Sequence, residues 1–230
     1  ATGLQGYVGS LVRFPAAAGS TGAGVSSDLR HLWANGRFRR LLLARVVSNL
    51  GNGMAPIALA FGVLSLRGAN AGSLSLVTTS QTVPLVAFLL LGGVAADRFG
   101  RARLVGMTDM LGSMFAGLSG LSFLLGFASV PLLCINGFVF GILNALWYPA
   151  FSGLMPEVVP NDHIQSANAT VGIGSNLAYT AGAALAGVLI VSAGPGWAIL
   201  IDAASFFVAG VLVFGLRKHS RLESSADVEA

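Results

Sequence analysis

The chain is organised as long apolar stretches separated by short polar or charged breaks. Six of these stretches are long enough to cross a bilayer, whose hydrocarbon core takes about 20 apolar residues in a helix. They cover approximately residues 41–64, 74–96, 104–127, 131–154, 164–191 and 197–216. None has the alternating pattern of about ten residues that is typical of an outer-membrane barrel strand. The pattern predicts an all-α membrane protein with six transmembrane helices.

The composition agrees with this prediction. Hydrophobic residues make up 54% of the chain and charged residues 10%, whereas about a quarter of the residues in a soluble domain are charged. The single cysteine, Cys134, falls inside the fourth stretch, so no disulfide can form within the chain. We expect a flexible cytoplasmic N-terminal tail over residues 1–36, a six-helix bundle over 37–217, and a polar cytoplasmic tail or linker over 218–230.

Basic residues collect at alternate breaks between the stretches. They precede the first, follow the second and follow the sixth: Arg30, Arg37, Arg39 and Arg40; Arg98, Arg101 and Arg103; Arg217, Lys218 and Arg221. Six spans place all three groups on one face of the membrane, and the other face carries only Arg67. Because cytoplasmic loops retain Lys and Arg, both termini are predicted to be cytoplasmic. Topology and attraction to anionic lipid explain the net charge of +4, which therefore implies no nucleic-acid partner.

The break after the second stretch carries a recognisable motif. The sequence GGVAADRFGRAR, residues 92–103, places four charged residues in a tight turn, with its key positions at Gly93, Asp97, Arg98, Gly100 and Arg101. This pattern resembles the G-x-x-x-D-R-x-G-R-[KR] signature of the major facilitator superfamily, in the loop where that family carries it. The final basic position is Ala102 here, and Arg103 follows one place later. The resemblance implies a conformational latch at this turn.

Three further segments extend the resemblance to the bacterial drug and siderophore exporter branch of that superfamily. They are LWYPAFSGLMPEVVP (146–160), SANATVG (166–172) and DAASF (202–206). The resemblance covers residues 37–217, which correspond to one six-helix half of a twelve-helix fold with three-plus-three inverted repeats. It implies a bacterial cytoplasmic membrane protein, a small-molecule substrate, and a C-terminal six-helix half as the partner that this chain lacks. The antiporter pattern of helix five is incomplete, because Gly182 and Gly187 are present without its proline.

Polar residues inside the spans are the candidates for a binding site, because each is unfavourable in hydrocarbon and tends to face a cavity or a partner. Arg45, Asn49 and Asn52 are spaced i, i+4 and i+7, so they share one face of the first helix. We predict that this stripe lines a substrate cavity together with Asn144, Tyr148 and Asn176. An alternative is that Arg45 only fixes the first helix by pairing with carbonyls or an acid.

Two aspartates lie at similar depths in the third and sixth spans. Asp109 and Asp202 are candidates for ion pairs or for ion coupling, and an inverted repeat would put them on opposite sides of the membrane. His31, His163 and His219 are far apart in the sequence and lie outside the spans, which gives no metal-ligand spacing. There is also no Gly-x-x-x-x-Gly-Lys phosphate loop. We therefore expect no cofactor, no metal site and no enzymatic activity.

These features together predict a secondary active transporter that exports a small amphipathic molecule by alternating access, driven by an ion gradient. Two alternatives stay open. One is a non-transporting six-helix protein, either a truncated half or a scaffold, and the other is an uptake permease of the same fold.

Overall fold

The computed structural model describes residues 30–216, and its main elements are six long helices. These are α3 (Gly36–Leu64), α4 (Ala71–Phe99), α5 (Arg101–Leu124), α6 (Val130–Val158), α7 (Ile164–Ala193) and α8 (Pro195–Phe214). A single 3₁₀ turn, Asn161–His163, precedes α7. All six helices are long and apolar enough to cross a membrane, and no strand occurs within residues 30–216. The predicted all-α architecture with six membrane spans is confirmed.

Local capping explains why several helices are longer than the apolar stretches that predicted them. The Asn35 side chain accepts hydrogen bonds from the backbone N–H groups of Arg37 and Phe38, so α3 begins at Gly36 rather than near residue 41. Asn70 and Ser73 form a reciprocal capping box at the start of α4. Gly100 has a φ of 83° and separates α4 from α5 with a single residue.

The described part of the region expected to be an N-terminal tail is helical. Residues 30–34 form a short helix before α3, and Leu32 is buried in the core while Trp33 is exposed. Residues 1–29 and 217–230 lie outside the described range, so the expectations for both tails stay untested.

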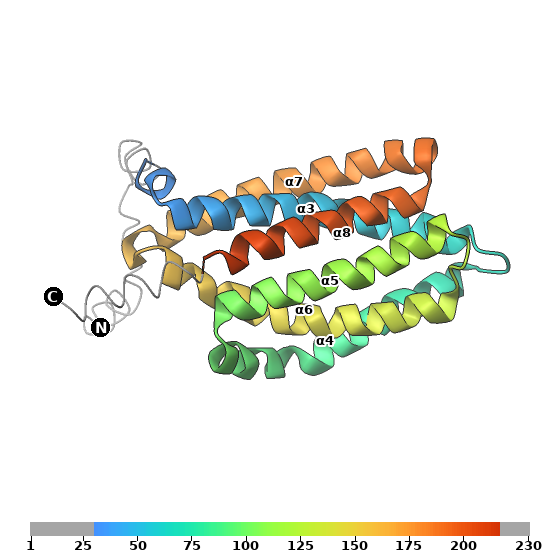
Figure 1. The fold of residues 1–230 in the computed structure, drawn as a ribbon, viewed down its shortest axis with the longest axis horizontal. Helices are drawn as coiled ribbons and strands as arrows, with labels where there is room; N and C mark the ends of the chain where they lie inside the picture. The colour runs from blue at the N-terminus through green and yellow to red at the C-terminus, as the bar shows by residue number, and fades with distance from the viewer. Residues whose placement is uncertain (1–29, 217–230) are drawn as a thin grey trace, which may run out of the picture.

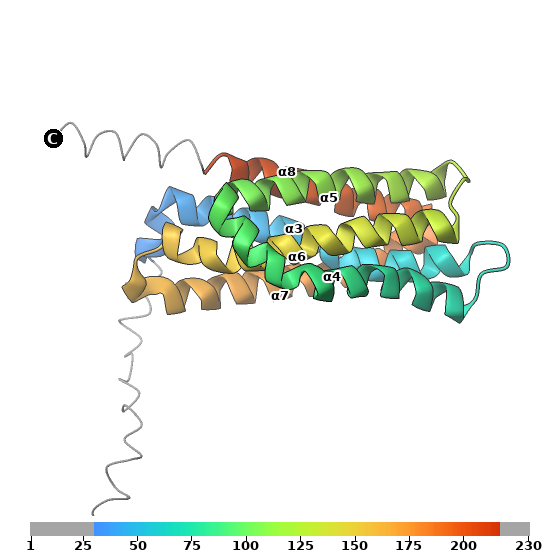
Figure 2. The same cartoon turned by 90° about the horizontal axis from the view of Figure 1, so that it is seen from below.

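The helices form two groups of three that lie side by side (Figure 1). One group contains α3, α7 and α8, and the other contains α4, α5 and α6, with α5 packed against α8 between them. The start of α3, the end of α8 and the α4–α5 and α6–α7 turns share one end of the bundle, while the other three turns lie at the opposite end. Figure 2 shows the second group from below. Six crossings thus bring both ends of the described chain to one side.

The packing pattern has an internal symmetry. α3 packs on α7 and α8, α6 packs on α4 and α5, and α5 packs on α8. Exchanging α3 with α6, α4 with α7, and α5 with α8 reproduces this set of contacts. Because three helices form each unit, equivalent helices cross the bundle in opposite directions. The structure therefore contains the predicted inverted repeat of three plus three helices.

Glycines allow the closest helix contacts, as is usual in membrane bundles. A Cβ atom at Gly182 of α7 would strike the backbone carbonyl of Leu50 on α3. Between α5 and α8, a Cβ at Gly120 or at Gly196 would lie 3.0 Å from the other glycine's carbonyl oxygen. α3 and α6, in contrast, hardly touch, and the space between them holds the site described next.

Candidate functional site

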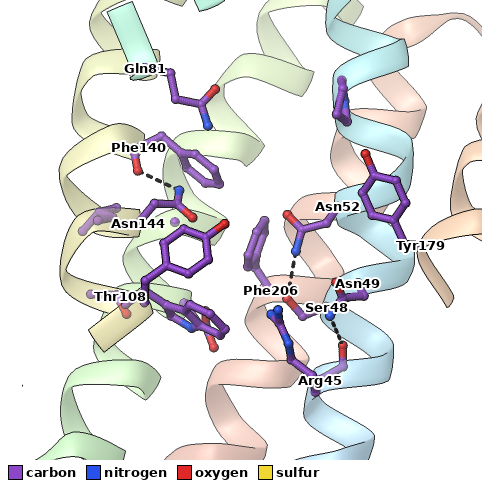
Figure 3. Close-up of a pocket in the computed structure, with 16 residues that line it drawn as sticks. Arg45, Ser48, Asn49, Asn52, Gln81, Thr108, Phe140, Asn144, Tyr179 and Phe206 are labelled. Atoms are coloured by element: carbon purple, nitrogen blue, oxygen red, sulfur yellow. Dashed lines mark hydrogen bonds between the residues drawn. The ribbon is translucent and has the colours of Figure 1, made fainter. Parts of the chain in front are cut away.

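A polar cavity of about 270 Å³ lies between α3 and α6 in the middle of the bundle (Figure 3). Side chains from all six helices line it, and α3 and α6 supply most of its polar groups. The polar and aromatic lining residues are Arg45, Ser48, Asn49, Asn52, Gln81, Thr108, Asp109, Phe140, Asn144, Trp147, Tyr148, Tyr179 and Phe206.

The predicted stripe on α3 does face this cavity. The Asn49 amide donates to the Arg45 carbonyl (2.7 Å), and the Asn52 amide lies 3.4 Å from the Ser48 hydroxyl (Figure 3). Across the cavity, the Asn144 amide donates to the Phe140 carbonyl (2.8 Å). These bonds within each helix orient the side chains, so two walls bearing amides face each other.

Arg45 is held by aromatic rings and by an acid. Its guanidinium lies 4.5 Å from the ring centre of Trp147 and 4.9 Å from that of Phe151, and these two rings stack on each other. Asp109 of α5 is buried and interacts electrostatically with Arg45. The Trp147 indole nitrogen lies near Asp109 without a well-formed hydrogen bond. Arg45 therefore connects α3 with α5 and α6 across one end of the cavity.

The structure brings together five of the six residues predicted to line a cavity. Asn176 is the exception, because it is exposed on α7 and does not line the cavity, and Tyr179 faces the cavity from the same helix instead. Sequence reasoning also missed Ser48 and Gln81. Both are polar residues inside predicted spans, the signal that identified their neighbours, and Ser48 lies one turn before Asn52.

Asp202 lies elsewhere. It is buried in α8 and lines a different cavity, whereas Asp109 lines the polar one. Counted from the starts of α8 and α5, the two aspartates are each roughly 10–12 Å inside the bundle. Since α5 and α8 begin at opposite ends of the bundle, the two acids occupy opposite halves of it.

The turn between α4 and α5 is organised around Arg101. Its guanidinium donates to the Gly153 carbonyl (2.7 Å) on α6 and forms ion pairs with Asp97 and Glu157, both at 3.4 Å. Arg98 is exposed, and its guanidinium lies 5.9 Å from the Phe99 ring centre. The motif thus joins the α4–α5 turn to the end of α6.

The glycines of this motif differ in their surroundings. Gly93 has open space where a side chain would be, whereas a Cβ at the preceding Gly92 would strike the Ala145 carbonyl on α6. Gly92 was not among the predicted motif positions, although it makes the closer contact.

Two histidines that are distant in the sequence meet at the same end of the bundle. The rings of His31 and His163 stack with their centres 5.7 Å apart, so separation in the sequence did not imply separation in space for this pair. His219 lies outside the described residues. Within residues 30–216, no group of three or more potential ligands could hold a metal ion.

Comparison with known proteins places the chain in a family. The family described as "transmembrane secretion effector", within the major facilitator superfamily, matches residues 30–228. The chain belongs to this family. As a family of transporters, it is not a class of enzymes. The chain is therefore a multi-pass membrane protein of the major facilitator superfamily.

Curated proteins similar to this chain include the MFS-type transporter YkuC of Bacillus subtilis, which is 25% identical to it over 187 residues. Another is the multidrug efflux pump Tap of Mycobacterium tuberculosis, 28% identical over 187 residues. These alignments cover 81% and 77% of this chain but 43% of each relative. The chain thus spans less than half the length of the relatives it matches. No solved structure matches it significantly.

Proposed function

We propose that the protein is a secondary active transporter of the bacterial cytoplasmic membrane that exports a small amphipathic molecule, with its termini in the cytoplasm. The observation that carries this proposal is the polar cavity between α3 and α6 inside an otherwise apolar bundle. Amides and a guanidinium at bilayer depth are unfavourable unless they serve a ligand, water or another polar partner. Transporters of this architecture hold substrate near the membrane midplane.

The chemistry of the cavity suits an amphipathic ligand. Asn49, Asn52 and Asn144 supply hydrogen-bonding groups, while Tyr148 and Phe206 supply aromatic faces. Such a mixture favours molecules with an apolar body and a few polar groups. The name of the relative Tap, a multidrug efflux pump, favours export over uptake.

Alternating access requires a second wall. In the proposed transporter, a second six-helix half covers the open side of the cavity, and rocking of the two halves exposes it to each side of the membrane in turn. The relatives, of which this chain matches 43%, have length enough for such a half. The Arg101 contacts hold the latch at the cytoplasmic end in this scheme.

An efflux assay tests the function. Cells that lack their own exporters and express the proposed two-half transporter, this chain joined to a second six-helix half, are loaded with a fluorescent amphipathic dye and then energised. We expect faster dye loss than in cells with an empty vector, and a protonophore that collapses the ion gradient should abolish the difference. Equal dye loss with and without this transporter across a panel of amphipathic dyes and drugs would contradict the proposal.

Cysteine labelling tests the site. In a Cys134→Ser background, Asn52→Cys should react with a membrane-impermeant thiol reagent, and an exported dye should slow the reaction. Asn176→Cys is the matched control, because Asn176 was also predicted for the cavity but lies outside it; its reaction should not depend on dye. Asn52→Cys reacting only with a lipid-soluble reagent would show that the stripe faces lipid.

A further inference from the structure

The second buried acid, Asp202, lines a cavity of its own. This cavity has a volume of about 290 Å³ and lies in the half of the bundle where α8 begins. The last turns of α3 and α5 and the first turns of α4, α6 and α8 form its walls, with side chains such as Leu59, Leu133 and Ile199. Asp202 is the one ionisable side chain among the residues that line it.

The Asp202 carboxyl group has no partner in the described part of the chain. The side chain is 2% exposed, and its Oδ1 atom is buried without a hydrogen bond. The nearby Ser205 hydroxyl donates to the Asp202 backbone carbonyl (2.7 Å) and not to its carboxyl. α3 packs directly against this carboxyl, because a Cβ at Gly51 would strike the Asp202 Oδ1 atom and the Ser205 hydroxyl and would lie 2.8 Å from the Asp202 Cα.

No charged group on the helices packed against α8 compensates a charge on Asp202. On α3, Arg45 lines the first cavity and stacks on Trp147. On α5, Asp109 lies beside Gly210, about two turns further along α8. On α7, Tyr179 lines the first cavity. Beyond these helices, Cys134 of α6 packs beside Leu133 on the cavity wall.

The two cavities adjoin. Asn52, Pro56, Gln81 and Phe140 line both of them. Phe140 packs edge-on against Phe206 (ring centres 5.5 Å apart), and Phe206 lies one turn after Asp202 on the same face of α8. Asp202 is therefore one turn of helix away from the wall of the first cavity.

We propose that Asp202 is a proton-binding site, separate from the pair formed by Arg45 and Asp109, and that it exchanges its proton with water in the second cavity. A carboxylate buried without a hydrogen bond or a cation is strongly disfavoured, and a bound proton removes the charge. The proton comes from hydronium, leaves a neutral carboxylic acid, and returns to water when the site opens. Asn136 and Thr78 on the cavity wall offer polar groups to that water.

The coupling role of Asp202 depends on the transport function proposed above, whereas proton binding by Asp202 does not. In the coupling role, protonation and deprotonation of Asp202 alternate with occupation of the first cavity, with Asn52 and Phe140 as the shared wall. Asp202 is then the residue through which the proton gradient drives transport.

Infrared spectroscopy of the purified chain in lipid nanodiscs tests the site without any transport measurement. At neutral pH exposed carboxyls are ionised, so the C=O stretch of a protonated carboxyl reports a buried acid. In pH-difference spectra, which cancel the ester C=O bands of the lipid, we expect such a band at neutral pH, its reversible loss as the pH is raised, and its absence in Asp202→Asn. Asp97→Asn and Asp109→Asn are the matched controls and should retain it.

Several outcomes would overturn the proposal. One is a band that Asp202→Asn leaves unchanged, and another is a band that persists at every pH, as expected of a purely structural acid. Loss of the band on addition of Na⁺ at constant pH would assign the site to sodium instead. If Asp202→Asn does not fold, Asp202→Glu provides the test. Because it keeps a carboxyl group in a slightly different position, it should shift the frequency of the C=O band, and that band should still be lost as the pH is raised. Since dye efflux is measured separately, failure of this inference and failure of the transport function are distinguishable.

Discussion

Arg45 shows how this protein accommodates a charge at bilayer depth. Stacking on Trp147 and Phe151 covers the faces of the guanidinium, and Asp109 supplies the opposite charge. A planar guanidinium suits this arrangement, whereas a lysine ammonium has no flat face to stack. We therefore propose a structural role for Arg45 at the edge of the cavity, with Asn49 and Asn52 as the better candidates for contact with a ligand.

This role predicts a graded response to substitution. Arg45→Lys should lower the free energy of unfolding by about 0.5–2 kcal/mol, the loss expected for a desolvated cation–π contact. Arg45→Met should lower it by roughly 3–5 kcal/mol, because it leaves Asp109 buried without a partner. Unfolding in mixed detergent micelles measures both changes. Asp109→Asn added to Arg45→Met should recover part of the loss, and simple additivity of the two substitutions would contradict the coupling between these residues.

The candidate site was predictable where spacing within one helix determines a face. Arg45, Asn49 and Asn52 line the cavity as their i, i+4, i+7 spacing required. On α7, Asn176 and Tyr179 are about one turn apart, and each stands next to another polar residue, Ser175 or Thr180, so the local pattern did not distinguish them. The rotation of α7 is set by its contact with α3, where Gly182 meets Leu50. That information lies in a second helix and not in the local pattern.

At the scale of elements, that same contact fixes the distance between α3 and α7. Gly182→Ala places a methyl group against the Leu50 backbone, which cannot move as a flexible side chain would. We expect a loss of roughly 1–3 kcal/mol in unfolding free energy, the range typical of overpacking. Gly187→Ala on the same helix is the matched control, because nothing lies within 4 Å of a Cβ there. Equal stabilities of the two variants would show that α7 shifts without penalty.

The number and type of the membrane-spanning helices were predictable from the sequence, and their ends were not. Twenty or more apolar residues have one favourable arrangement in a bilayer, since every backbone polar group must be satisfied within the segment. The ends depend on single side chains such as Asn35, whose amide oxygen starts α3 before its apolar stretch begins. The C-terminal end of α6 also lies beyond its predicted boundary at residue 154, because the helix continues through Pro149 and Pro156 to Val158.

The latch proposed at the α4–α5 turn predicts a loss of transport without a loss of stability. Asp97 is mostly exposed, and ion pairs of exposed side chains contribute about 0–1 kcal/mol. Asp97→Asn should therefore leave membrane insertion and thermal stability nearly unchanged while it reduces dye efflux several-fold. Glu157→Gln removes the other ion pair of Arg101 and serves as the comparison. Unchanged efflux in Asp97→Asn would leave these charges with a role in topology alone.

At the scale of the whole molecule, the inverted repeat places the two acids at related positions, and their neighbouring side chains make their surroundings different. α5 and α8 are equivalent helices that cross the bundle in opposite directions, so Asp109 and Asp202 occupy opposite halves. Asp109 has Arg45 as its partner, whereas the described part of the chain provides no cation for Asp202. A symmetric backbone thus carries an asymmetric pair of acids, one balanced by an arginine and one suited to a mobile proton.

The bundle also presents an open cavity wall, which predicts that residues 1–230 on their own do not transport. Tyr148 lines the cavity and is 51% exposed, and Arg45 lies beside it. Lipid against this wall is unfavourable, by roughly 2.5–3.5 kcal/mol for an arginine at the centre of a helix. We therefore expect the purified 230-residue chain to dimerise or to lose stability in detergent, and liposomes containing it as a monomer to show no gradient-driven dye flux above protein-free liposomes. Cross-linking identifies the oligomeric state in the same liposomes. Gradient-driven flux by the monomer would show that this six-helix bundle forms a complete transport pathway and would contradict the requirement for a second six-helix half.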